Sequence, residues 1–251
     1  ASLAACAPSS SAHGLAVVAT TTQVCDYVTQ IAARSADISL DKTDAAGKSS
    51  HVGAPADGAA LTMSLTCLLA PNASAHEHEM TPAQTSALAQ ADVMAVSGVD
   101  LEHFLDDAVV SSGFKGRMIV TSGVLTAADI DNPGTPDPES AYTIDRGSER
   151  VDVAPWPFPP EEAGEEPEFR FDPHVWTSPK GARVQIANLG AGLAAAAPDA
   201  ASSINAATAS YLEDIDALDQ WTAEAIKTVP EGQRVLFTSH DAFGYFSRDY
   251  G

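Results

Sequence analysis

Residues 15–32 read LAVVATTTQVCDYVTQIA and predict the start of an α/β fold. Leu15 to Thr20 is a short apolar run with the length of a buried strand. Thr21 follows directly and belongs to the residue types that cap helices. Apolar side chains then recur at helical spacing, namely Val24, Val28 and Ile31. A buried strand that leads straight into an amphipathic helix is typical of sheets covered by helices.

The same alternation continues along the next part of the chain. Thr81, Pro82 and Gln84 mark a helix start, because they suit the cap, the first helical position and the capping box. Further strands are predicted at residues 65–69, 93–96 and 118–121, and another helix at 101–111. Alternating strands and helices favour a parallel sheet with helices on both faces.

Two stretches lack the pattern of a regular element. Residues 36–60 are rich in Gly, Ala, Asp and Ser and have no apolar period, so we expect a surface insertion or loop. Residues 129–171 are acidic and rich in proline, which breaks helices and strands. We therefore expect neither stretch to form a helix or strand.

Helices dominate the C-terminal third. Pro179 opens one helix, and a second, nearly uninterrupted helix is predicted at 199–228. The Pro-Glu-Gly sequence at 230–232 ends this helix. We then expect a strand at 235–238 and a helix from Phe243.

These elements predict four parts of the chain. They are a tether at 1–14, an N-terminal lobe at 15–199, a linking helix at 200–229 and the start of a second lobe at 230–251. Some twenty residues cannot close a sheet of their own. Either the second lobe joins the first sheet, or the sequence is a fragment.

The composition is that of a folded acidic protein. The 251 residues are 45% hydrophobic and carry 34 acidic against 13 basic side chains, a formal charge of -21. This balance argues against nucleic acid as a partner, because a polyanion would be repelled. No run of eighteen apolar residues occurs, so we expect no helix that spans a membrane.

The three cysteines fall into two groups. Leu3-Ala4-Ala5-Cys6 resembles a bacterial lipobox, and the serines after it suit a flexible tether. Lipidation of Cys6 would anchor the protein to the outer face of the cell membrane by its lipid alone. A periplasmic location is the alternative. Cys25 on the first helix and Cys67 on the next strand could form a disulfide, or remain buried thiols.

Three histidines occupy positions suited to a ligand site. His76 and His240 each follow a predicted strand, and ligands bind beyond the carboxyl ends of strands in open α/β sheets. His174 lies in Asp-Pro-His, where the proline restricts the backbone. Three converging imidazoles would make most of a tetrahedral zinc site. We interpret the others as solvated side chains: His13, His51 and His103.

Two further features surround these histidines. His78 lies two residues from His76, so an extended loop would point the two rings to opposite sides and one site would use only one of them. Acidic side chains nearby could accept a hydrogen bond from a metal-bound imidazole, or could simply be solvated. They are Glu77, Glu79, Asp172 and Asp241.

Four segments together resemble a known family. They are VVATTTQVCDYVTQIA at 17–32, HEHEMTPAQ at 76–84, DPHVWTSP at 172–179 and TSHDAFGYFSRDYG at 238–251. The chain is similar to the zinc/manganese-binding lipoproteins, the solute-binding components of bacterial metal ABC importers. That fold has two α/β lobes joined by one long rigid helix, with the metal in the cleft.

The resemblance implies a ligand set. The first histidine of the loop is the family ligand, which selects His76 over His78. Asp-Pro-His supplies His174, and the third position is His240, where zinc-type members tend to have histidine and many manganese-type members glutamate. The fourth family ligand, an Asp or Glu of the second lobe, is expected beyond residue 251.

We therefore expect an extracytoplasmic protein that captures Zn²⁺ and delivers it to an ABC-type metal permease, without catalysis. A manganese-binding member of the same family is the nearest alternative. A zinc hydrolase with Glu77 as general base is another, although no HExxH sequence occurs. A third alternative is an adhesion or interaction module in which the metal is only structural.

Overall fold

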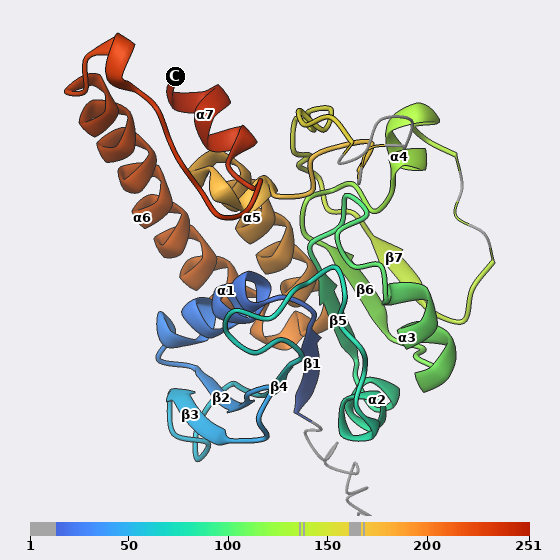
Figure 1. Ribbon diagram of the computed structural model, residues 1–251. Helices are drawn as coiled ribbons and strands as arrows, with labels where there is room; N and C mark the ends of the chain where they lie inside the picture. Colours follow the sequence, from blue (N-terminus) through green and yellow to red (C-terminus); the bar gives the residue numbers. More distant parts are fainter. Residues whose placement is uncertain (1–13, 136, 138, 161–166, 168) are drawn as a thin grey trace, which may run out of the picture.

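A computed structural model describes residues 14–135, 137, 139–160, 167 and 169–251. These residues form one seven-stranded sheet with helices on both faces (Figure 1), which confirms the predicted α/β class. The strands lie in the order β3-β2-β4-β1-β5-β6-β7. Their bounds are β1 Leu15–Ala19, β2 Ile38–Thr43, β3 Ser49–Gly53, β4 Leu61–Cys67, β5 Val93–Val96, β6 Arg117–Val120 and β7 Thr143–Asp145.

The strand pairs are parallel except where β3 runs antiparallel to β2. The residues that the structure describes form seven helices: α1 Thr22–Ala33, α2 Pro82–Ala89, α3 Leu105–Ser112, α4 Ala127–Asp131, α5 Pro179–Ala196, α6 Ala201–Lys227 and α7 Gly244–Tyr250. Short 3₁₀ turns lie at η1 Val175–Thr177, η2 Pro198–Ala200 and η3 Glu231–Gln233. In this described part, no helix is both long and apolar enough to cross a membrane.

Both faces of the sheet are buried under helices. Val17 of β1 points to the cluster formed with α1, α5 and α6, while the next residue, Val18, points to the cluster formed with α2 and α3. This follows from the period of two along a strand. A strand covered on both sides must be apolar throughout, which explains the run that begins the fold.

The predicted helix starts are confirmed at atomic level. The Thr21 hydroxyl accepts a hydrogen bond from the backbone N–H of Val24 at the start of α1. Thr81 and Gln84 form the reciprocal capping box of α2. Each cap satisfies helix N–H groups that have no partner within the helix.

The expectation of a loop at 36–60 was wrong. Residues 38–43 form β2, which pairs in parallel with β4 and fully buries Ile38 and Leu40 under α1. The polar residues 49–53 form β3 at the sheet edge, where the outer face remains exposed. Burial of these two apolar residues and pairing with β4 thus stabilise β2 as a strand, although the residues around them are polar.

Two other expectations were also wrong. Residues 129–171 include the end of α4 and the strand β7, which pairs with β6 at the other edge of the sheet. Residues 235–238, expected as a strand, have no regular structure, and Phe237 is 92% exposed. A strand requires a pairing partner, and none of the described residues pairs with this segment.

The long C-terminal helix is confirmed as α6. Its first half packs on α5 and α1 through Ile204, Tyr211 and Ile215, whereas Trp221 beyond them is exposed. Figure 1 shows α6 extending past the sheet with α7 near its far end. No second sheet is seen in the described ranges, and the division into lobes with a linking helix stays a prediction.

Candidate metal centre

The three predicted histidines lie together. One ring nitrogen from each of His76, His174 and His240 lies within 4.8 Å of the other two. His76 comes from the loop between β4 and α2, His174 directly precedes η1, and His240 lies between η3 and α7. The fold thus brings together three side chains that are distant in sequence.

His174 is the most firmly held of the three. Its side chain is 1% exposed, and its Nδ1 lies 2.8 Å from Oδ1 of Asp172. The backbone N–H of His174 donates to the same carboxylate oxygen at 2.9 Å. With Nδ1–H donating to the carboxylate, Nε2 presents its lone pair to the centre of the cluster.

His240 faces His174 directly. The two Nε2 atoms are 3.1 Å apart, although His240 itself is exposed. Two nitrogen ligands on a tetrahedral zinc ion with bonds of about 2.0–2.1 Å would be roughly 3.3 Å apart. The two rings therefore already have nearly the separation that one shared ion requires.

His76 closes the cluster and is half-buried. Burial is the main reason that its pKa falls to about 4, and positive charge on His174 would lower it further. A low pKa keeps the ring neutral at pH 7, as a metal ligand requires. Its buried Nδ1 has no hydrogen-bond partner within the described part of the chain, a further property suited to a ligand.

Of the four candidate supporting acids, only Asp172 contacts one of these histidines. Glu77, Glu79 and Asp241 are exposed, and across the described ranges none of them hydrogen-bonds a ring of the cluster. Burial explains the difference, because Asp172 is shielded from water together with His174. Solvated carboxylates gain little from one added hydrogen bond.

The cysteine predictions have different outcomes. A disulfide joins Cys25 of α1 to Cys67 at the end of β4, so of the two alternatives the structure contains the bond. This bond lies at the strand end from which the His76 loop departs. Cys6 lies outside the described residues, and its lipidation stays a prediction.

Several aromatic residues around the centre were missed from the sequence. Phe169 lies with its ring centroid 4.9 Å from that of His76, and Trp156 lies 5.9 Å from His174. His103, expected to be solvated, is indeed exposed, but its ring lies 6.0 Å from that of His76. The one available signal was an aromatic-rich sequence in an otherwise polar, proline-rich segment just before His174.

Comparison with known proteins places the sequence in a family. The model of the zinc-uptake complex component A, periplasmic (ZnuA), family matches residues 56–251, which include all three histidines. The chain belongs to the ZnuA family. This agrees with the resemblance to solute-binding components of metal ABC importers.

Relatives in this group are named for different metals. The manganese-binding lipoprotein MntA of Bacillus subtilis is 28% identical over 187 residues, 74% of this chain and 51% of the relative. The iron-binding protein YfeA of Yersinia pestis is 28% identical over 181 residues, 72% of this chain and 48% of the relative. The chain thus spans about half the length of the curated relatives it matches.

The fold is shared with solved structures. The structure of Zn(II)-bound AdcA from Streptococcus pneumoniae superposes with a TM-score of 0.62 at 20% identity. The match covers 95% of this chain and 38% of that one. At this identity the likeness shows the fold alone.

Proposed function

We propose that this protein captures a divalent metal ion, preferentially Zn²⁺, outside the cytoplasm and hands it to an ABC-type metal permease. The observation that supports this most is the convergence of His76, His174 and His240 within 4.8 Å. Family membership supports the importer assignment. The proposed ligands are one ring nitrogen from each histidine.

Zinc is proposed over manganese because of the donor atoms. Three imidazole nitrogens suit a tetrahedral zinc ion, whereas manganese favours more oxygen ligands. Manganese remains the second candidate, since the relative MntA is named as a manganese-binding lipoprotein. The fourth ligand is proposed to be an Asp or Glu carboxylate.

The three proposed ligand histidines have different roles when the ion binds. Asp172 fixes the tautomer and orientation of His174, so this ring is ready before the ion arrives. His240 is exposed and can meet an ion that arrives from solvent. A neutral His76 then supplies a third nitrogen without first losing a proton at pH 7.

We propose binding and release without catalysis. A zinc hydrolase would need a base that can reach a metal-bound water, and Glu77, the candidate considered for this role, is exposed. The relatives carry names of binding proteins. Anchoring through a lipidated Cys6 is proposed to keep the protein near its permease.

The test is isothermal titration calorimetry of the metal-free protein with Zn²⁺, with Mn²⁺ in competition. His174→Ala and His240→Ala are each expected to weaken zinc binding by more than about 100-fold, above the cost of losing a supporting group. His51→Ala is the matched control, because His51 lies on β3 and pairs with Asp41. Unchanged zinc affinity in either ligand variant would remove that histidine from the site.

A further inference from the structure

We propose that Phe169 and Trp156 determine metal selectivity. Their rings form an apolar wall, called here the aromatic wall, against two of the proposed ligands, His76 and His174. This wall disfavours ions that need additional water ligands. This inference rests on the proposed function, since it concerns the same site. It assigns a role to the proline-rich stretch at 129–171, which has no role in the proposed binding of the ion.

Phe169 is the centre of this wall. It is only 5% exposed, and its ring centroid lies 4.9 Å from that of His76 and 6.2 Å from that of His174. The ring is nearly perpendicular to His174, with an interplanar angle of 88°. One buried phenylalanine thus contacts two of the three proposed ligands and offers neither of them an oxygen atom.

Trp156 extends the wall along His174. Its ring lies 5.0 Å from Phe169 and 5.9 Å from His174, measured between centroids. Trp176 lies 5.4 Å from the same histidine. His174 is therefore enclosed by three aromatic side chains, in agreement with its near-complete burial.

Backbone hydrogen bonds join the two strands of chain that carry the wall. The N–H of Trp156 donates to the carbonyl of Arg170 at 3.1 Å, and the N–H of Asp172 donates to that of Ala154 at 2.9 Å. Pro155 and Phe171 form an antiparallel bridge between these bonds. The ladder continues directly into Asp172, which orients His174, so wall and ligand share one support.

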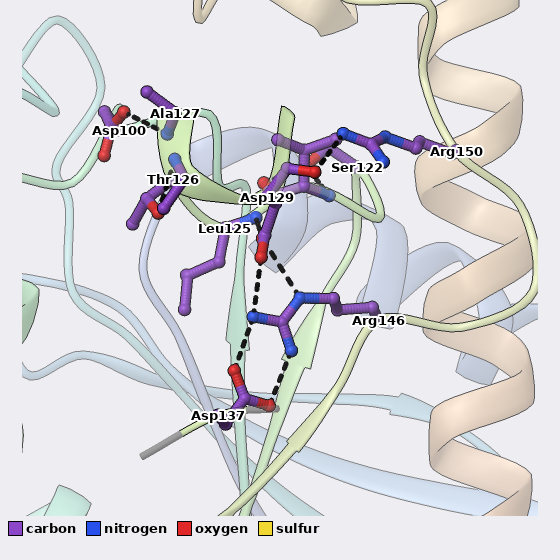
Figure 2. A network of polar contacts seen from close by, with 11 residues as sticks. Asp100, Ser122, Leu125, Thr126, Ala127, Asp129, Asp137, Arg146 and Arg150 are labelled. Carbon is purple, nitrogen blue, oxygen red and sulfur yellow. Dashed lines mark hydrogen bonds and ion pairs between the residues drawn. The ribbon is translucent and has the colours of Figure 1, made fainter. Parts of the chain in front are cut away.

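Ion pairs link parts of the 129–171 stretch to one another and to α4. Figure 2 shows Arg146 between Asp129 and Asp137. Its Nη2 lies 2.9 Å from the carboxylate of Asp129 and 2.7 Å from that of Asp137. Arg170, next to Phe169, forms a two-point ion pair with Asp131 of α4. Arg146 and Arg170 thus both pair with residues of α4.

The chemical consequence concerns coordination number. Zinc is satisfied by four ligands, whereas manganese favours sites with more oxygen atoms, which water commonly supplies. Apolar groups around a site control solvent access to the ion. Aromatic rings packed against His76 and His174 therefore weaken the binding of manganese more than that of zinc.

The experiment measures the ratio of Zn²⁺ to Mn²⁺ affinity by competition, for wild type, Phe169→Ala, Phe169→Leu and Trp156→Ala. Phe169→Ala and Trp156→Ala should reduce the preference for zinc by about tenfold, while Phe169→Leu, which keeps apolar volume, should retain it. Bound Co²⁺ gives an independent signal: added water ligands should weaken its visible absorption in the alanine variants. Trp156 is half-buried, so Trp156→Ala carries the test where Phe169→Ala fails to fold.

Tyr142→Ala is the matched control, because Tyr142 is an aromatic residue of the same segment that packs on Phe114 instead. Its affinity ratio should equal that of wild type. A wild-type protein that binds neither ion would overturn the proposed function itself. Tight zinc binding in all variants, with ratios and Co²⁺ spectra unchanged in both alanine variants, would overturn only the role of the aromatic wall.

Discussion

His174 and His240 face each other across 3.1 Å but come from opposite surroundings. His174 is buried, hydrogen-bonded to Asp172 and followed at once by η1 and α5. His240 is exposed and belongs to a stretch without regular structure that also exposes Phe237. His174 thus belongs to the buried part of the fold, whereas His240 lies at its surface.

This difference indicates how the site is prepared. A ligand that is already oriented loses little freedom when the ion binds, whereas an exposed one must be ordered at that moment. We therefore expect substitutions on the buried side to affect stability and affinity, and those around His240 to leave the fold intact. The following predictions test this contrast.

The largest effect on stability is expected from the buried disulfide at the end of β4. Cys25 and Cys67 are separated by 42 residues in sequence, so removing the bond should lower the free energy of unfolding by about 4 kcal/mol. The measurement is urea unfolding of the Cys25→Ala/Cys67→Ala variant. Reduced wild type is the control and should shift in the same direction. A loss below about 1 kcal/mol would contradict the prediction.

The second effect concerns Glu102, a buried acid in the loop after β5. The two oxygens of its carboxyl group accept hydrogen bonds from the backbone N–H groups of Ser97 and Gly98 and from the Thr20 hydroxyl. In Glu102→Gln an NH₂ group replaces one acceptor and leaves one of these donors unpaired. The expected loss is about 1–3 kcal/mol in the free energy of unfolding.

The pH dependence of this loss has a defined sign. Burial raises the pKa of Glu102 above its ordinary value of 4.5, so the folded state binds this proton more tightly than the unfolded state. The contribution to stability is complete below pH 4.5 and declines as pH rises through the folded pKa. The difference between wild type and Glu102→Gln in urea unfolding should therefore shrink towards high pH. A difference that grows with pH would contradict this assignment.

The third effect compares two acids beside the facing histidines. Asp172→Asn should weaken zinc binding by about 10–100-fold, because it removes the charged acceptor that orients His174. Asp241→Asn, next to the exposed His240, should change the affinity by less than about twofold. Calorimetry measures the zinc affinity of both variants. Equal losses of affinity would contradict the distinction between the buried His174 and the exposed His240.

The smallest effect is expected at Phe237, which is 92% exposed. Phe237→Ser should alter the free energy of unfolding by no more than about 0.5 kcal/mol, as is usual for exposed positions. Urea unfolding of the chain measures this directly. A loss of several times this value would mean that the segment carrying His240 is packed more firmly than its exposure indicates.

The sequence predicted the buried parts of the fold more accurately than its edges. β5 and α5 were found because continuous apolar runs and proline caps act locally. β2 was missed since only Ile38 and Leu40 mark it, and its stability comes from pairing with β4. The expected strand at 235–238 failed for the converse reason, because this apolar run has no pairing partner among the described residues.

The same division applies to the site. His76 could be singled out because it follows a predicted strand, observed as β4, and His174 because it lies in a restricted Asp-Pro-His turn. His240 was singled out from a strand expected at 235–238, which the structure does not contain. Phe169 and Trp156 could not, because their contacts with His76 and His174 depend on how a proline-rich segment folds back on itself. Which acid supports a ligand was likewise decided by burial, which separates Asp172 from Glu77.

The most direct test of the shared site is X-ray absorption at the zinc edge on the zinc-loaded chain. Three imidazole nitrogens at about 2.0–2.1 Å are expected, and His240→Ala should show one fewer. A zinc ion without imidazole scattering, or a spectrum unchanged in both His174→Ala and His240→Ala, would show that these histidines do not meet around one ion.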